Sequence, residues 1–492
     1  MNNKYENGVE IIGSASNSQV DQKKRREDQI EGNRAIGNGR DQDIPISEKI
    51  TIEKALDRFV YIVKGSRIAD LKNISRDLRM DEFHNCYISS EHLVVSSNTD
   101  AQGVERSTKT NKKVTGQWLK SDHRQEVFTR TFKAGDQLIV VDPDANVALN
   151  LWNGFRMHPE ITTDDELLVE YFLCHCKIIF GDSTEKFLDW LAHIRQKPGV
   201  LPHYGWISIA TNTGVGRNWM ASALVRVFAG YVAASFDLPA MLESGFNGDL
   251  SRKILAIVDE IQEGGNGQWK HAEKLKSIVN QEYRTINPKC EPQHKEYNSC
   301  RWLVFSNHLN AIPLNETDRR FEVVITESQP QNEGYFKKIY VLLDNPAFIS
   351  SIALFLERRD ISNFNPGARP KMSEAKIRMI EESKSETQKL ADEIVKYYPF
   401  DVITLDNIYQ LLNTDHRDKS VRPVCDTAGM ISYPKSIRIS GSKHRCRIIR
   451  NHAKWLGATT EELRVEAQKL GFGEIASEVL LTAMENIMCI DI

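Results

Sequence analysis

The sequence has few cysteines, and no two of them form a CxxC pair. Its 492 residues include 8 cysteines. This scarcity argues against a disulfide scaffold or a zinc ribbon and predicts a reducing compartment. The close cluster Cys174-His175-Cys176 lies inside an apolar run. It favours a buried helix over a metal site, because a second pair of ligands is missing elsewhere.

Long hydrophobic runs and net charge are also lacking. No apolar run approaches the roughly 20 residues of a membrane span, and the first residues contain no signal-peptide core. We therefore expect a cytoplasmic protein without a membrane partner. The 64 Lys and Arg residues nearly balance the 67 Asp and Glu residues, giving a net charge of −3. The total charge thus gives no argument for a nucleic-acid, membrane or acidic partner, and it does not exclude a local basic surface.

Changes in composition and the positions of proline and glycine divide the chain into six segments. At roughly 150 residues per domain, the length predicts about three domains. The segments are a polar, disordered tail (1–45), an α+β region of unknown role (46–160), an α/β nucleotide-binding domain with a preceding helical segment (161–365), a Pro-containing linker (366–384), a small terminal domain (385–455) and a helical tail (456–492).

A glycine-rich turn between a strand and a helix is the first motif that indicates chemistry. An apolar strand over 206–210 precedes the turn, and a helix over 219–228 follows it. A P-loop has this context, because backbone N–H groups and the helix N-terminus bind phosphate there. The candidate nucleotide-binding residues are Thr213, Gly214, Val215, Gly216, Arg217 and Asn218.

The turn departs from the P-loop pattern GxxxxGK[ST] at three positions. Thr211 replaces the first glycine, Arg217 replaces the lysine, and Asn218 replaces the Ser or Thr that binds Mg²⁺. Arginine keeps the positive charge but is larger and forked. Asparagine can offer its carbonyl oxygen to the metal. Taken alone, the turn is equally consistent with a plain strand–turn–helix.

An acidic pair follows the next buried-type strand, over 253–258. Carboxylates at the end of a strand beside a P-loop suit Mg²⁺ binding and water activation. In this reading Asp259 binds the metal and Glu260 polarises the attacking water. The alternative is a helix-capping pair.

Polar residues also flank two later strands. The strand over 302–305 leads to Asn307, whose amide can hydrogen-bond both a γ-phosphate and a water. Arg319 and Arg320 come just before the strand over 321–325. They form surface ion pairs or reach the γ-phosphate of a neighbouring subunit as an arginine finger.

These four elements, in this order and spacing, resemble superfamily 3 helicases, above all the helicase region of phage, plasmid and poxvirus-type primase-helicases. The resemblance covers roughly residues 150–385. It implies an AAA+-like P-loop ATPase core that forms a ring, expected to be a hexamer, with ATP between subunits.

The resemblance also assigns roles to individual residues. Asn218 and Asp259 would bind Mg²⁺, while Glu260 and Asn307 would act in catalysis. Arg319 or Arg320 would be the finger supplied to the neighbouring subunit, and the sequence does not choose between them.

A basic segment between the acidic and polar strands matches the family's hairpin that grips single-stranded DNA. Lys289 matches the lysine of that hairpin, with Lys276 and Arg284 as neighbours. A moving basic loop needs only phosphate contacts, which fits translocation independent of sequence. The alternative is an exposed basic loop with no DNA contact.

The terminal domain combines two helices with a basic hairpin. The helices are expected over 386–396 and 405–412. Alternating residues over 437–439 and 446–448, with Gly441-Ser442 between them, predict a hairpin. Together these elements look like a winged helix.

Positive charge gathers in this hairpin. Residues 431–454 contain seven Lys or Arg and no acidic residue, which suits phosphate binding. The alternative is a solvated hairpin that faces an acidic partner domain. The candidate DNA contacts are Lys443, Arg445 and Arg447.

The fold class that follows is α/β, with a mixed α+β N-terminal region and a C-terminal winged-helix-like domain around the ATPase core. The leading hypothesis is an ATP-dependent DNA helicase in the replication of a phage or other mobile element, located in the host cytoplasm if phage-encoded. It would act on single-stranded and replication-fork DNA, beside a primase or host replication proteins. The alternative is a non-hydrolysing or weakly hydrolysing replication initiator or loader with a degenerate P-loop.

Overall fold

The computed structural model describes residues 49–99, 105–156, 159–234, 236–259, 275, 278–290, 292–312 and 314–469. The chain divides into two compact units near residue 153, and the first unit contains residues up to 132 together with 137–153. The predicted tail over 1–45 lies outside the described residues, as do residues 470–492 of the predicted helical tail.

The N-terminal unit is a mixed α+β fold, as the sequence predicts for this region. A sheet in the order β3-β2-β1-β6 packs against three helices around the rings of Phe59, Phe83 and Trp118. Its elements are α2 (Ile52–Arg58), β1 (Phe59–Ile62), β2 (Arg67–Asp70), β3 (Asn73–Leu78), α3 (Met80–Cys86), β4 (Glu91–Thr99), β5 (Glu105–Lys113), α4 (Val114–Lys120), β6 (Gln125–Val127), β7 (Thr129–Thr131), β8 (Ile139–Val141) and β9 (Val147–Asn150).

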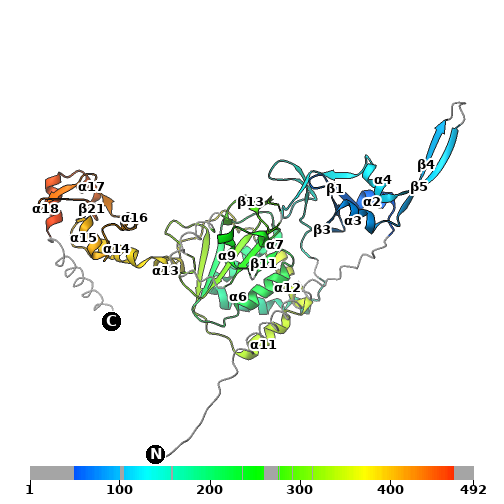
Figure 1. Cartoon of the computed structure of the whole chain (residues 1–492). Helices are drawn as coiled ribbons and strands as arrows, with labels where there is room; N and C mark the ends of the chain where they lie inside the picture. The colour runs from blue at the N-terminus through cyan, green and yellow to red at the C-terminus, as the bar shows by residue number, and fades with distance from the viewer. Residues whose placement is uncertain are drawn as a thin grey trace, which may run out of the picture. The chain divides into compact units, whose positions relative to one another are not determined.

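The core of the second unit is a five-stranded parallel sheet in the order β11-β12-β15-β10-β16 (Figure 1). Every residue of β10 is buried, because helices cover parallel sheets on both faces. The strands are β10 (Gly205–Ala210), β11 (Val232–Ala234), β12 (Leu255–Val258), β15 (Arg301–Ser306) and β16 (Phe321–Thr326).

Helices surround this sheet in the pattern that the sequence predicts. The helical stretch over 164–195 is divided among α5, α6 and α7, and the one over 336–358 is α11 and α12. Within the described residues no single helix is long and apolar enough to span a membrane, although α11 and α12, bent by 82°, pass that test as a pair. The helices are α5 (Thr163–Glu166), α6 (Val169–Phe180), α7 (Thr184–Gln196), α8 (Arg217–Val227), α9 (Leu238–Ser244), α11 (Glu333–Leu342) and α12 (Pro346–Arg358).

The predicted linker over 366–384 is only partly a linker. It contains helix α13 (Glu374–Ser383), which packs against the core sheet and buries Lys376 completely. The ammonium group donates to Asp318 Oδ1 (3.0 Å) and to the carbonyls of Asp318 and Phe321. The sequence did not reveal this contact, because the two partners lie 58 residues apart.

The C-terminal domain has the order helix, strand, two helices, several short strands and then two further helices. The helices predicted over 386–396 and 405–412 are α14 and α15. The hairpin is shorter than predicted: β19 pairs with β20, and β21 joins β17 and β18 in a separate sheet. The elements are α14 (Glu386–Tyr397), β17 (Val402–Thr404), α15 (Leu405–Leu411), α16 (Val421–Thr427), β18 (Ile431–Ser432), β19 (Ile437–Ile439), β20 (Ser442–His444), β21 (Cys446–Ile448), α17 (His452–Leu456) and α18 (Thr460–Gln468).

The Lys376–Asp318 pair predicts a large effect of mutation. Lys376→Ala leaves the Asp318 carboxylate buried without its cation, which costs about 3–5 kcal/mol of folding free energy. Arg378→Ala on the same helix is the control, because its ion pair with Glu327 is exposed and is worth less than about 1 kcal/mol. Urea unfolding of both variants checks this, and equal losses would contradict the buried-pair account.

Candidate nucleotide-binding site

The candidate site lies at the carboxyl edge of the core sheet, where three adjacent strands end. The glycine-rich turn follows β10, Asp259 follows β12, and Asn307 follows β15, which lies between the other two strands. In open parallel sheets, loops at the carboxyl ends of the strands form the ligand site. Residues more than 40 positions apart in sequence are therefore placed at one edge.

Gly216 gives the turn its shape. It caps the N-terminus of α8 in the left-handed conformation, with φ +91°, and Gly214 also has a positive φ of +76°. A Cβ on Gly216 would collide with the imidazole of His175, lying 2.7 Å from its Nε2. Glycine is therefore required at this position for both its conformation and its lack of a side chain.

Three candidate residues of the turn are exposed, and one apolar residue fixes the turn to the core. Thr213, Gly214 and Asn218 are exposed, whereas Val215 is buried. The first N–H groups of α8 have no acceptor within the helix, and the helix dipole adds partial positive charge. An exposed loop of this kind can hold a phosphate group.

Arg217 connects the turn to the neighbouring strand. The residue is 8% exposed, and Nη2 donates to Asn307 Oδ1 at 2.6 Å. The two residues that the sequence assigns to phosphate contact and to γ-phosphate sensing are thus in direct contact. A ligand phosphate at this edge can meet both groups.

His175 supports the turn from behind. Its Nε2 lies 3.0 Å from the Gly216 carbonyl, which can only accept, so Nε2 carries the proton. The other nitrogen, Nδ1, then accepts from the hydroxyl of Tyr335 at 2.8 Å. Burial lowers the pKa of His175 to about 4, opposed by the bond to Gly216, and burial raises that of Tyr335 to about 12. The imidazole is therefore neutral at pH 7.

The cluster Cys174-His175-Cys176 is part of helix α6, as the buried-helix interpretation predicts. Cys174 is exposed and Cys176 is buried, so the two thiols face different environments. No group of three or more His, Cys, Asp or Glu residues in the described part of the chain could hold a metal ion. The role of His175 in supporting the glycine-rich turn was missed; the sequence shows only that His175 lies inside an apolar helical run.

The acidic end of β12 fits a divalent cation through its donor chemistry. Asp259 is exposed at the strand end, and Asn218 is exposed at the start of α8. A carboxylate with an amide oxygen and waters is a donor set that Mg²⁺ accepts. Glu260 lies outside the described residues.

Arg319 and Arg320 lie at the opposite end of the strands, where β10 and β16 begin. They precede β16, whose first residue pairs with Gly205 at the start of β10. The two ends of a six-residue strand are about 20 Å apart. Neither arginine can therefore reach the glycine-rich turn of its own chain, so the expected nucleotide contact would require a neighbouring subunit.

The basic segment after β12 contains a β-hairpin with Lys289 in its turn. Strands β13 (Tyr283–Ile286) and β14 (His294–Tyr297) pair antiparallel, and Lys289 is exposed between them. Lys276 lies outside the described residues.

Arg284 differs from the exposed DNA contact that the sequence predicted. Its side chain is buried within the hairpin and pairs with Glu296 at 3.2 Å. Burial raises the pKa of Glu296, but hydrogen bonds from His294 and neighbouring groups, together with the charge of Arg284, lower it to about 2. Arg284 therefore stabilises the base of the hairpin.

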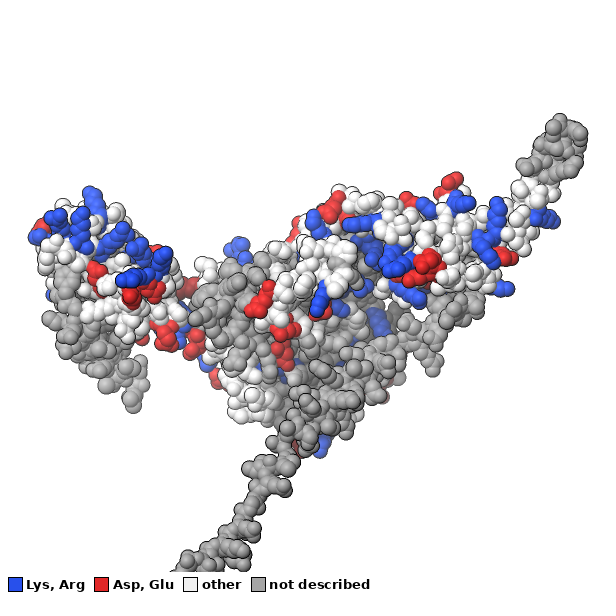
Figure 2. All heavy atoms as spheres, in the orientation of Figure 1, with Lys and Arg blue, Asp and Glu red and all other residues white. Residues whose placement is uncertain are grey.

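Two of the three basic candidates in the C-terminal domain are exposed. Lys443 and Arg445 are accessible, and Figure 2 shows Lys and Arg side chains gathered on the visible face of this domain. Arg447 differs from the prediction: it is 5% exposed, pairs with Asp426 and donates to the Met430 carbonyl. It holds α16 against the sheet and is not available to DNA.

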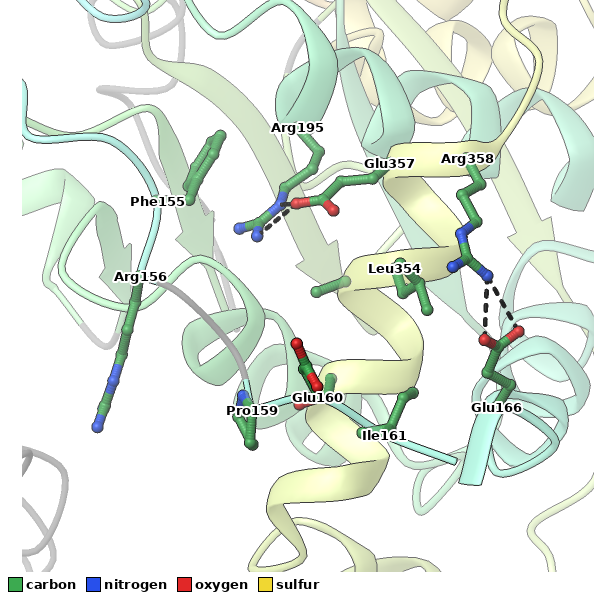
Figure 3. A pocket seen from close by; sticks show the side chains of 12 residues that line it. Phe155, Arg156, Pro159, Glu160, Ile161, Glu166, Arg195, Leu354, Glu357 and Arg358 are labelled. Atoms are coloured by element: carbon green, nitrogen blue, oxygen red, sulfur yellow. Dashed lines mark hydrogen bonds and ion pairs between the residues drawn. The ribbon is translucent and has the colours of Figure 1, made fainter. Parts of the chain in front are cut away.

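A pocket of about 580 Å³ lies elsewhere in this unit, between residues 155–156 and 159–161, α7 and α12 (Figure 3). The guanidinium of Arg195 bonds Glu357 at 2.7 Å and lies over the ring of Phe155. Arg358 pairs with Glu166. These arginines are neutralised by carboxylates, and no P-loop residue lines the pocket, so it is not the candidate site.

Comparison with known proteins gives partial matches. A family of unknown function (DUF5906) matches residues 209–320. The DNA primase-polymerase of Nitratiruptor phage NrS-1 is 25% identical over 146 residues, which are 29% of this chain and 20% of that protein. The chain thus matches about a fifth of the length of this curated relative.

Solved structures give weaker likenesses. The apo NrS-1 C-terminal region (305–718) is 16% identical, with a TM-score of 0.49, over 72% of this chain and 96% of that one. An inhibitor-bound JCV helicase is 11% identical, with a TM-score of 0.28, over 47% and 64% of the respective chains. The strand order and register define the fold here, independently of these likenesses.

The contact between Gly216 and His175 predicts the effect of added side chains. Gly216→Ala should destabilise the core and abolish nucleotide binding, because its Cβ meets the imidazole. Gly230→Ala is the matched control, since it shares a positive φ of +88° but opens onto empty space. This control should lose only about 1 kcal/mol of folding free energy, because a side chain is unfavourable in this backbone conformation. Thermal unfolding and nucleotide titration compare the two, and similar losses would contradict the contact.

The buried neutral His175 predicts a pH dependence. The unfolded chain protonates this group near pH 6.5 but the folded chain only near pH 4. Its contribution is therefore full above pH 6.5 and is lost as the pH falls towards 4, by about 3 kcal/mol. His175→Gln keeps a donor for Gly216 and should flatten the dependence. Urea unfolding between pH 4 and 7 measures the free energy of unfolding of both proteins. The same pH dependence in wild type and His175→Gln would contradict the assignment.

Proposed function

We propose that the chain is the ATP-driven motor of a phage replication helicase, which hydrolyses ATP to move along single-stranded DNA. The observation that carries this proposal is the convergence at one sheet edge of a left-handed glycine turn, Arg217 in contact with Asn307, and the exposed Asp259. Together these residues supply backbone N–H groups for a phosphate, a positive charge, a side-chain amide and a carboxylate.

Each group has a distinct task in this proposal. The N–H groups of the turn and the Arg217 guanidinium bind the phosphates, and Asn218 and Asp259 hold Mg²⁺. Bound between Asn218 and Asp259, Mg²⁺ would supply neutralisation of the phosphate charge. Glu260 orients and deprotonates the water, while Asn307 hydrogen-bonds the γ-phosphate and that water.

The DNA contacts come from exposed lysines and arginines. Lys289 at the hairpin turn grips the backbone of one strand, and Lys443 and Arg445 contact fork DNA. Ring assembly as a hexamer, with Arg319 or Arg320 supplied to the next subunit, accounts for the position of those arginines away from their own P-loop. An AAA+-like core of the superfamily 3 type fits this arrangement.

The curated relative supports a role in phage replication. It is named a DNA primase-polymerase of a phage, and the similarity supports a DNA-acting role in phage replication. We therefore propose the host cytoplasm as the location and a primase or host replication proteins as partners.

A specific observation favours a second function, that of a DNA-binding initiator or loader with little hydrolysis. Arg217 stands in place of the P-loop lysine and is hydrogen-bonded to the group that would sense the γ-phosphate. If a bound nucleotide leaves this bond intact, turnover would be slow.

Steady-state ATP hydrolysis, with and without single-stranded DNA, tests the proposal. We expect turnover that rises with DNA and falls at least 100-fold in Glu260→Gln, because removing a general base costs about that factor. ATP binding without turnover would support the loader. No hydrolysis and no effect of Glu260→Gln would refute the helicase proposal.

The position of Lys289 predicts a selective effect on DNA stimulation. Lys289→Ala should reduce the stimulation of ATP turnover by single-stranded DNA at least fivefold and weaken DNA binding, because a phosphate contact is lost. Lys371→Ala is the control, since it removes an exposed lysine outside the hairpin. Equal stimulation in both variants would show that the hairpin turn is only a basic loop.

A further inference from the structure

A long two-stranded ribbon extends from the N-terminal unit. Strands β4 and β5 pair antiparallel over nine residues each, from Glu91 opposite Lys113 to Thr99 opposite Glu105 (Figure 1). Nine residues span about 30 Å. An isolated ribbon of two strands is marginally stable by itself and gains most from a partner.

The base of the ribbon is fixed in the unit. The buried hydroxyl of Ser90 accepts a hydrogen bond from the Ile50 amide at 2.9 Å, and the Val114 amide donates to the Ser90 carbonyl. Both ends of the ribbon therefore leave the unit at buried, hydrogen-bonded residues. The ribbon is an anchored arm.

The arm is basic along β5. From Ser107 to Lys113 every side chain is exposed, and the charged ones are three lysines. Lys113 pairs with Glu91 at the base. In the described part of the chain no carboxylate pairs with Lys109 or Lys112. The pairing register places Lys109 and Lys112 on opposite faces of the ribbon.

Two apolar side chains accompany this charge. Leu93 and Val95 are 52% and 56% exposed and share the face of Lys109, which lies directly opposite Val95. Exposed apolar groups beside unpaired lysines form a surface for a partner that is both anionic and partly apolar. They contribute little to the stability of the free protein.

We infer that this ribbon is a DNA-binding arm that enters the major groove of duplex DNA. The major groove, about 12 Å wide, admits a two-stranded ribbon, whereas the minor groove of about 6 Å is too narrow. Lysines on both faces meet the phosphates on both sides of the groove. Leu93 and Val95 contact base methyl groups and sugars.

Other occupants fit the ribbon less well. Its strands contain no Phe, Trp or Tyr on which the bases of a single strand could stack. Lysines on an edge strand disfavour pairing with a strand of a second copy. The inference rests on the proposed function in assuming a chain that acts on DNA, and it assigns the duplex ahead of the fork to a part of the chain outside the ATPase core.

Anisotropy titrations of the full chain test the arm, with a 20-base-pair duplex and the matching single strand at several salt concentrations. Lys109→Glu with Lys112→Glu should weaken duplex binding at least tenfold and lower the salt slope by about two. The control is Lys54→Glu with Lys64→Glu, which makes the same charge change at exposed sites outside the ribbon. It should lower duplex affinity less than threefold.

A second variant separates binding from folding. Leu93→Thr with Val95→Thr places β-branched, strand-compatible side chains at both positions. It should leave the thermal midpoint within 2 °C of the wild type and weaken duplex binding at least threefold.

Three results would overturn the inference. They are equal losses in the two lysine pairs, a loss confined to single-stranded DNA, or an unchanged duplex affinity with an altered oligomeric state, which would assign the ribbon to a second copy. Wild-type ATP turnover with single-stranded DNA is measured in parallel. Absent turnover with ribbon-dependent duplex binding would reject the helicase motor and leave the arm standing.

Discussion

The candidate site depends on one hydrogen bond, between the Arg217 guanidinium and the Asn307 amide at 2.6 Å. It joins the first residue of α8 to the end of β15 and so holds two neighbouring strand ends in one arrangement. Arg217 is buried, and a buried guanidinium is costly unless acceptors surround it. In the proposed function, a nucleotide phosphate would compete with Asn307 for this guanidinium, so binding would be coupled to the position of Asn307.

The glycine-rich turn is held from the side opposite to its exposed face. His175 donates to Gly216 and accepts from Tyr335, so α6 and α11 together fix the carbonyl of the left-handed glycine. Because the imidazole is neutral, it adds no positive charge behind the phosphate cradle. The electrostatics of the site are thus left to Arg217, the helix N-terminus and the acidic end of β12.

The core sheet could be predicted from the sequence because buried parallel strands are continuous apolar runs between polar turns. The expected strand over 206–210 is β10, and the glycine-rich turn after it leads into helix α8, as expected. Local patterns did not predict contacts between distant residues. Arg284 and Arg447 belonged to basic stretches, yet both side chains are buried in the structure, where Arg284 pairs with Glu296 and Arg447 with Asp426. Likewise, the hydrogen bond that gives His175 its role joins residues 41 positions apart.

The central claim, that this sheet edge binds a nucleotide through Arg217, is tested most directly by equilibrium titration of Mg²⁺·ATP into the full chain by calorimetry. The account predicts one nucleotide per chain, with affinity at least tenfold weaker in Arg217→Ala and partly restored in Arg217→Lys. Since a phosphate contact by a charged donor is worth roughly 1.5–3 kcal/mol, a loss of this size is expected. No binding by the wild type, or equal binding by wild type and Arg217→Ala, would contradict it.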